Sequence, residues 1–276
     1  MLEFIIQNNI VCHAVEAMLF ASVACAVLSV IITQVQISSI GFTMAHAAFA
    51  GAAVGMFLSL NPTVCSIVTG IGVAFLIGPL SDKARVSPDT ALGLLFGICM
   101  AVAIFFIAYM QTLGQGFSAM GLLFGDVISL YREEVYLLAA ICIVAIAVIV
   151  ILYKEITAII FDKRIAESVG VRVKPVYYAM LFVIALTVSF CLPIIGGLLL
   201  YVWLVTPAAV ALQFCNRLSA MFVVAPIVAA VVSISGALVG LEYSLPVAPL
   251  TAVLFSVVFI VAVFLSPRRR VTFRKT

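Results

Sequence analysis

Long apolar runs of about 20 residues each, separated by short polar stretches, make up most of the chain. A run of this length spans the hydrocarbon core of a bilayer as an α-helix, and the runs lack the strand-like alternation of an outer-membrane barrel. The pattern predicts nine membrane helices, over Ala14–Ile32, Thr43–Leu60, Pro62–Leu80, Ala91–Met110, Val135–Tyr153, Val176–Leu192, Ile194–Phe214, Met221–Val239 and Val247–Leu265.

The sixth and seventh runs meet at Pro193, Gly196 and Gly197 with almost no polar break between them. Two arrangements fit this junction, a tight hairpin between two helices or a single broken helix. The expected fold is therefore an all-α polytopic membrane protein, a bundle of eight or nine transmembrane helices.

The composition agrees with this pattern, because 66% of the residues are hydrophobic and only 9% are charged, with a mean hydropathy of +1.36. So few polar residues cannot cover a soluble globule. The spans occupy most of the 276 residues, so we expect one transmembrane domain over 1–276 with no nucleotide-binding domain. The chain has no G-x-x-x-x-G-K-[ST] phosphate loop and no His/Ser/acid catalytic arrangement, which favours a transport subunit over an enzyme.

The basic residues predict the orientation in the membrane. Of the 14 Lys and Arg residues, all but Arg132 fall on one side if nine spans are counted. The positive-inside rule makes that side, with the C-terminus, cytoplasmic. The basic tail over about 266–276 is typical of anchoring to an anionic leaflet, and the net charge of +3 requires no nucleic-acid partner.

A charged segment over residues 153–178 interrupts the apolar pattern after the fifth run. Asp162 is suited to N-cap a helix and Gly170 to end one, which predicts two helical turns over Asp162–Val169. Ile165, Ala166 and Val169 are expected to share one side as an apolar knob, rimmed by Lys163, Arg164 and Glu167. Such a helix fits a groove on another protein, although a solvated loop helix has the same periodicity.

His46 is the principal candidate for a site within the membrane, because it lies in the second apolar run among Ala and Gly residues. Thr43 precedes it by one helical turn, and Met44 offers a soft thioether. These residues could form a transient metal site in the translocation pathway. The alternatives are a histidine hydrogen-bonded to a neighbouring helix and a methionine that only packs.

The charged segment resembles the coupling segment of permeases of the zinc, manganese and iron class of ABC importers, through the pattern Phe-Asp-x-x-x-Ala-x-x-x-Gly-Val over residues 161–171. Further matches follow in the same order as in that family. They are Gly41, His46-Ala47 and Gly51, then Ser87 to Gly93, Leu123 to Asp126, and Thr206 to Ala211.

This resemblance implies a type II ABC importer-like fold with a short cytoplasmic coupling helix within about 161–172. Its ATPase-coupling residues would be Asp162, Lys163, Arg164, Ile165, Ala166, Glu167, Val169 and Gly170. It also implies a second copy of the chain, two ABC ATPase subunits that bind the ATP, and an extracytoplasmic solute-binding protein, in the plasma (inner) membrane of a prokaryote. The cargo would be a divalent transition metal, with no covalently bound cofactor.

Two departures from the family pattern concern the cargo. Members of the family usually carry Gly-Asp-x-x-Ser-His-Ala where this chain has Phe42 in place of the acid and Ala45 in place of the serine. The Asp-x-Pro-x-Gly-like stretch that leads into the last span reads Val247-Ala248-Pro249-Leu250-Thr251 here, without its acid or its glycine. The loss of a carboxylate disfavours a hard ion such as manganese relative to zinc or ferrous iron. A metal chelate, another small solute, or an ion-driven secondary transporter are the alternatives.

Overall fold

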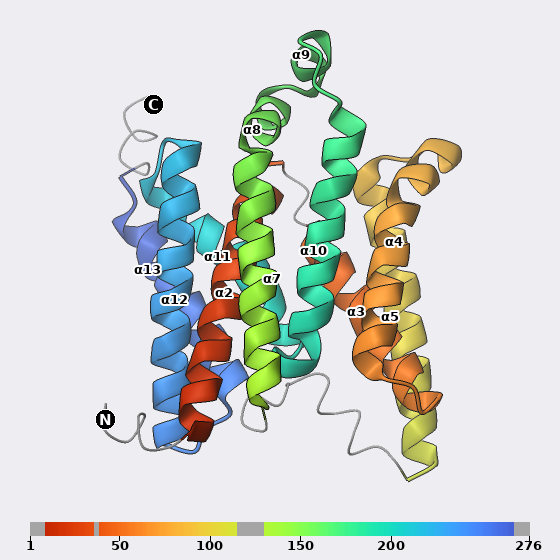
Figure 1. Ribbon diagram of the computed structural model, residues 1–276, viewed down its shortest axis with the longest axis vertical. Helices are drawn as coiled ribbons and strands as arrows, with labels where there is room; N and C mark the ends of the chain where they lie inside the picture. Colours follow the sequence, from red (N-terminus) through yellow and green to blue (C-terminus); the bar gives the residue numbers. More distant parts are fainter. Residues whose placement is uncertain (1–8, 36–38, 115–129, 268–276) are drawn as a thin grey trace.

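A computed structural model describes residues 9–35, 39–114 and 130–267, and within these ranges every element is a helix (Figure 1). Nine of the described helices are long and apolar enough to cross a membrane. They are α2 (Asn9–Gln34), α3 (Ser39–Phe57), α4 (Pro62–Ala84), α5 (Pro88–Thr112), α7 (Arg132–Ile151), α10 (Val173–Ile195), α11 (Gly197–Phe214), α12 (Leu218–Glu242) and α13 (Val247–Leu265). The predicted helical membrane bundle is confirmed.

The junction between the sixth and seventh apolar runs is a single residue, Gly196, between two separate helices. Its φ of 85° and ψ of 153° lie in a region that residues other than glycine avoid. The N–H of Gly196 still donates to the Leu192 carbonyl (2.9 Å), which closes the last turn of α10. The chain reverses direction here, so the hairpin reading of the sequence holds and the broken-helix reading does not.

Two short helices, α8 (Tyr153–Phe161) and α9 (Lys163–Ser168), follow α7 and lie beyond one end of the bundle (Figure 1). The apolar run was expected to continue to Tyr153, but α7 ends at Ile151 and α8 begins a new helix. Ile156 and Ile159 of α8 are buried at three-residue spacing. This short helix therefore lies with one side against the bundle.

The bundle has two parts joined by α10. Helices α3, α4 and α5 pack on one another, whereas α2 packs on α7, α11 and α12. Helix α10 contacts both α4 and α2, and α11 also packs on α3. Small residues make the contact of α3 with α4 close: a Cβ at Gly51 would meet the Cys65 carbonyl and the Thr69 side chain. The small residues predicted to allow close packing do so here.

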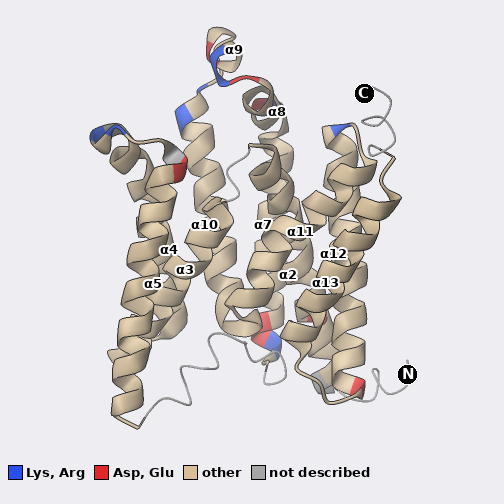
Figure 2. Cartoon of the chain, turned by 180° about the vertical axis from the view of Figure 1, so that it is seen from behind, with Lys and Arg blue, Asp and Glu red and all other residues tan. Residues whose placement is uncertain are grey.

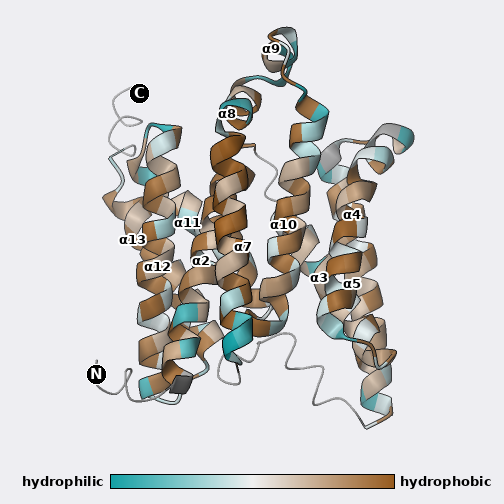
Figure 3. Cartoon of the chain, viewed as in Figure 1, coloured by the Kyte–Doolittle hydropathy of each residue, from teal (hydrophilic) through white to brown (hydrophobic). Residues whose placement is uncertain are grey.

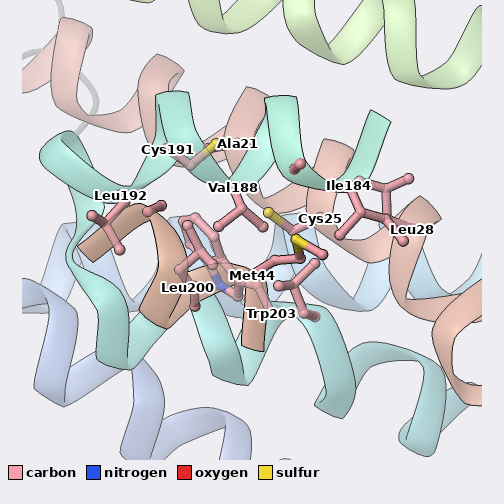
Figure 4. Close-up of a cluster of buried hydrophobic side chains, with 14 of the residues drawn as sticks. Ala21, Cys25, Leu28, Met44, Ile184, Val188, Cys191, Leu192, Leu200 and Trp203 are labelled. Atoms are coloured by element: carbon pink, nitrogen blue, oxygen red, sulfur yellow. The ribbon is translucent and has the colours of Figure 1, made fainter. Parts of the chain in front are cut away.

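The surface of the bundle is divided into an apolar middle and charged ends. Figure 2 shows Lys and Arg mostly at the end that carries α8 and α9, and Figure 3 shows apolar residues along the middle of the long helices. Five of the described cysteines are buried, and Cys25 and Cys191 lie in the main core (Figure 4).

Candidate functional site

The backbone of α9 is held by the two residues that the sequence pointed to. The Asp162 side chain (Oδ1) accepts hydrogen bonds from the N–H groups of Arg164 (2.7 Å) and Ile165 (3.2 Å). At the other end Gly170 has a φ of 87°, and its N–H donates to the Glu167 carbonyl (3.1 Å). A cap and a left-handed stop thus define a helix of one and a half turns.

The side chains of α9 are arranged differently from the predicted knob. Ala166 is only 1% exposed, while Ile165 and Val169 are 65% and 72% exposed. Ala166 faces inward because the helix rests on α8 and α10, so Ala166 is not part of the outward apolar surface. Phe161, 85% exposed at the end of α8, contributes instead. We call Phe161, Ile165 and Val169 the apolar trio.

Lys163 links α9 to the membrane bundle. Its Nζ lies 5.7 Å from the centroid of the Tyr177 ring on α10, within the range of a cation–π contact. Helix α9 packs mainly on α8 and α10, and α10 in turn packs on α3 and α4.

His46 lies among aromatic rings from three helices. Its ring centroid is 4.4 Å from that of Phe42 and 4.8 Å from that of Phe96 on α5, and the Phe42 centroid is 4.9 Å from that of Tyr201 on α11. The Nδ1 atom of His46 is hydrogen-bonded to the Phe42 carbonyl (2.8 Å), which leaves one ring nitrogen for any other partner. We call these four residues the His46 cluster.

Thr43 and Met44, the other two predicted pathway residues, have other partners than this cluster. The Thr43 hydroxyl lies 2.8 Å from the Ser39 carbonyl and 3.1 Å from the Leu92 carbonyl, which are both acceptors. Met44 is fully buried in the core beside Cys25 and Trp203 (Figure 4). Among the residues described, no group of three or more His, Cys, Asp or Glu side chains is placed to hold a metal ion.

Sequence reasoning missed Phe96 and Tyr201, because nothing in their own helices distinguishes them from packing residues. Of the matched motifs, Ser87 caps α5 by accepting from the Thr90 N–H (3.2 Å). The Leu123 to Asp126 motif lies outside the described residues.

Residues 7–266 match the ABC 3 transport family, which is most of the chain. The chain belongs to this family. Among curated relatives, the manganese transport system membrane protein MntC of Listeria monocytogenes is 26% identical, over 99% of this chain and 97% of that protein. The chelated iron transport system membrane protein YfeD of Yersinia pestis is also 26% identical, over 95% of this chain and 88% of that protein.

The fold of this ABC 3 family member is that of a solved relative. PsaBC from Streptococcus pneumoniae, in complex with a Fab, aligns with a TM-score of 0.86 at 20% identity, covering 100% of this chain and 98% of that one. The expected fold, a type II importer-like permease bundle, is therefore confirmed.

Proposed function

We propose that this chain is the membrane permease subunit of an ATP-driven importer that moves a divalent transition metal to the cytoplasm by alternating access. The observation that carries the proposal is α9, a capped helix that projects from the basic end of an ABC 3 family bundle and exposes the apolar trio. Such a surface fits the groove of another protein. The metal is proposed from the relatives that are named for manganese and iron transport.

The proposed assembly has two copies of this chain, two ABC ATPase subunits at α9, and an extracytoplasmic binding protein at the opposite end. The plasma membrane of a prokaryote would hold it with α9 and the C-terminus in the cytoplasm, since the described basic residues gather at that end (Figure 2). ATP is then bound and hydrolysed by the partner subunits.

The packing suggests how ATP-driven closure would reach the cargo. Movement of the ATPases displaces α9, the Lys163 to Tyr177 contact and the packing of α9 carry the displacement to α10, and α10 packs on α3, which bears His46. Because packed helices shift between discrete arrangements, a small displacement at α9 can switch access to the pathway.

The His46 cluster favours a second candidate cargo, a metal chelate. Among the described residues no carboxylate joins the one available imidazole nitrogen, which by itself cannot enclose a bare ion, whereas a chelate brings its own ligands. Aromatic rings also offer flat contact surfaces to an organic ligand. In either case His46 contributes at most one transient bond to the metal.

Reconstituted transport tests the proposal. Proteoliposomes that contain the chain with its ATPase and its binding protein are expected to take up manganese, zinc or ferrous iron only when ATP is supplied, and His46→Ala is expected to slow uptake. His13→Ala, which removes the other histidine, is the control. Equal uptake without the ATPase would indicate an ion-driven secondary transporter. Unchanged uptake of each metal in His46→Ala would remove His46 from the pathway.

A further inference from the structure

A cavity of about 260 Å³ lies between the end of α4, the start of α10 and the inner side of α9. It is smaller than the roughly 300–1,000 Å³ pockets that enclose a whole small molecule. It can therefore hold a charged group whose remainder extends outside. Its charged lining consists of Lys163 and Glu167 from α9 and Lys174 from α10.

The free hydrogen-bonding groups in this lining are mostly donors. Neither Lys163 nor Lys174 forms an ion pair within 4.0 Å among the described residues. The Tyr178 hydroxyl lies against Gly78, where any Cβ would meet it, and it has no hydrogen-bond partner in the same part of the chain. Ser81 is different, because its hydroxyl already donates to the Val86 carbonyl (2.8 Å).

Among the described residues the lining has two ammonium groups and two phenols, those of Tyr177 and Tyr178, against one carboxylate, Glu167, and the buried Tyr177 hydroxyl has no hydrogen-bond partner. This set makes a site for an anion with several acceptor oxygens. A phosphate group has that chemistry, and lysine binds it as a point charge. The lining from Ile77 to Ser81 and from Val173 to Tyr178 forms the last and first turns of two membrane spans. This is the depth at which phospholipid headgroups lie.

We propose that this cavity binds a phosphate group, supplied by an anionic phospholipid or by soluble phosphate, and that the bound group braces α9 against α4 and α10. The depth of the cavity favours the lipid. The inner leaflet as its source rests on the orientation in the proposed function. A bound phosphate would join α9 to both α4 and α10, whereas the packing of α9 is mainly on α8 and α10.

The test uses the full-length chain in phosphatidylcholine nanodiscs, read by native mass spectrometry. One arm adds phosphatidylglycerol to the bilayer, and a second adds inorganic phosphate to phosphatidylcholine alone. Wild type is expected to retain one phosphatidylglycerol per chain. The double variant Lys163→Gln/Lys174→Gln should bind about 30-fold more weakly, at about 1 kcal/mol per lysine near a membrane surface.

Two single variants separate binding from folding. Tyr178→Phe removes a hydroxyl without a protein partner and should weaken binding about threefold with no loss of stability. Glu167→Gln should strengthen binding of the phosphate group, whereas damage to the fold would weaken it. Lys154→Gln/Arg217→Gln, which removes two exposed charges outside the cavity, should leave it unchanged.

Binding of inorganic phosphate with the same dependence on these variants would identify the soluble source. Retention of neither phosphatidylglycerol in the first arm nor inorganic phosphate in the second, or occupancy that none of the cavity variants alters, would overturn the inference. The binding test uses the chain without its ATPase. ATP-coupled transport by a chain that binds no phosphate would therefore refute only this site. Phosphate binding without any ATPase coupling would refute only the proposed function.

Discussion

Helix α9 and the His46 cluster place their apolar side chains in opposite ways. At α9 the backbone is satisfied by Asp162 and Gly170, and the apolar trio is turned outward. In the His46 cluster the polar group is satisfied internally by the Phe42 carbonyl, and aromatic rings close around it. In the proposed function the first region binds another protein, and the second makes at most a transient contact with the cargo.

The apolar trio gives the largest expected effect. Phe161→Asp with Ile165→Asp should weaken binding of the ATPase by several hundredfold, because burial of each side chain contributes about 1.5–3 kcal/mol. Phe161→Leu with Ile165→Val keeps the surface apolar and is the control. Affinity for the purified ATPase is the measurement. Equal affinity in both double variants would mean that the ATPase binds elsewhere.

Ala166 tests whether the inner side of α9 positions the helix. Ala166→Leu adds volume at a buried site, which should destabilise the packing of α9 by about 1–3 kcal/mol. We expect α9 to shift outward to relieve this overpacking. ATP hydrolysis should persist while transport per ATP falls. Ser168→Leu enlarges the side chain at an exposed position of the same helix, and this variant should couple ATP hydrolysis to transport normally. If Ser168→Leu uncoupled transport as strongly, burial of Ala166 would not be the cause.

Substitutions at Gly170 test whether the left-handed backbone conformation that ends α9 matters. A Cβ at this position has open space around it, so Gly170→Ala adds only the strain of its φ of 87°, about 1–2 kcal/mol. Gly170→Asn should be milder, because asparagine tolerates this conformation. Thermal unfolding and transport per ATP are the measurements. Alanine and asparagine variants that behave alike would argue against a strained stop.

The smallest effect is expected at the His46 cluster, and it is a gain. Phe42→Asp places a carboxylate one turn before the imidazole and should raise manganese affinity about tenfold, because carboxylates suit that ion. Phe42→Asn, polar but uncharged, should not. Radiolabelled manganese binding distinguishes them, and an equal gain in both variants would show that removal of the ring, rather than the charge, matters.

Features set by neighbours in sequence were predictable. The last span was predicted as Val247–Leu265 and α13 has those bounds. The cap at Asp162 and the stop at Gly170 likewise depend on local chemistry. Other spans extend past their apolar runs, as α2 does in beginning at Asn9, because polar residues at a membrane surface continue a helix without entering hydrocarbon.

Features set by tertiary contacts were not predictable. Which side of α9 faces inward depends on α8, a helix hidden within the charged segment, so Ala166 was wrongly placed in the outward knob. Phe96 and Tyr201 reach His46 and Phe42 from separate helices. The spacing of residues within one helix carries no information on contacts between side chains of different helices.

Site-specific crosslinking tests most directly whether α9 is the docking site. A photoreactive amino acid at Ile165 (65% exposed, on α9) would be compared with one at Ile151 (74% exposed, at the end of α7). In membranes that contain the assembled transporter, we predict an adduct with the ATPase from position 165 and none from position 151. An ATPase adduct from position 151 alone, or none from position 165 in an active transporter, would contradict the account.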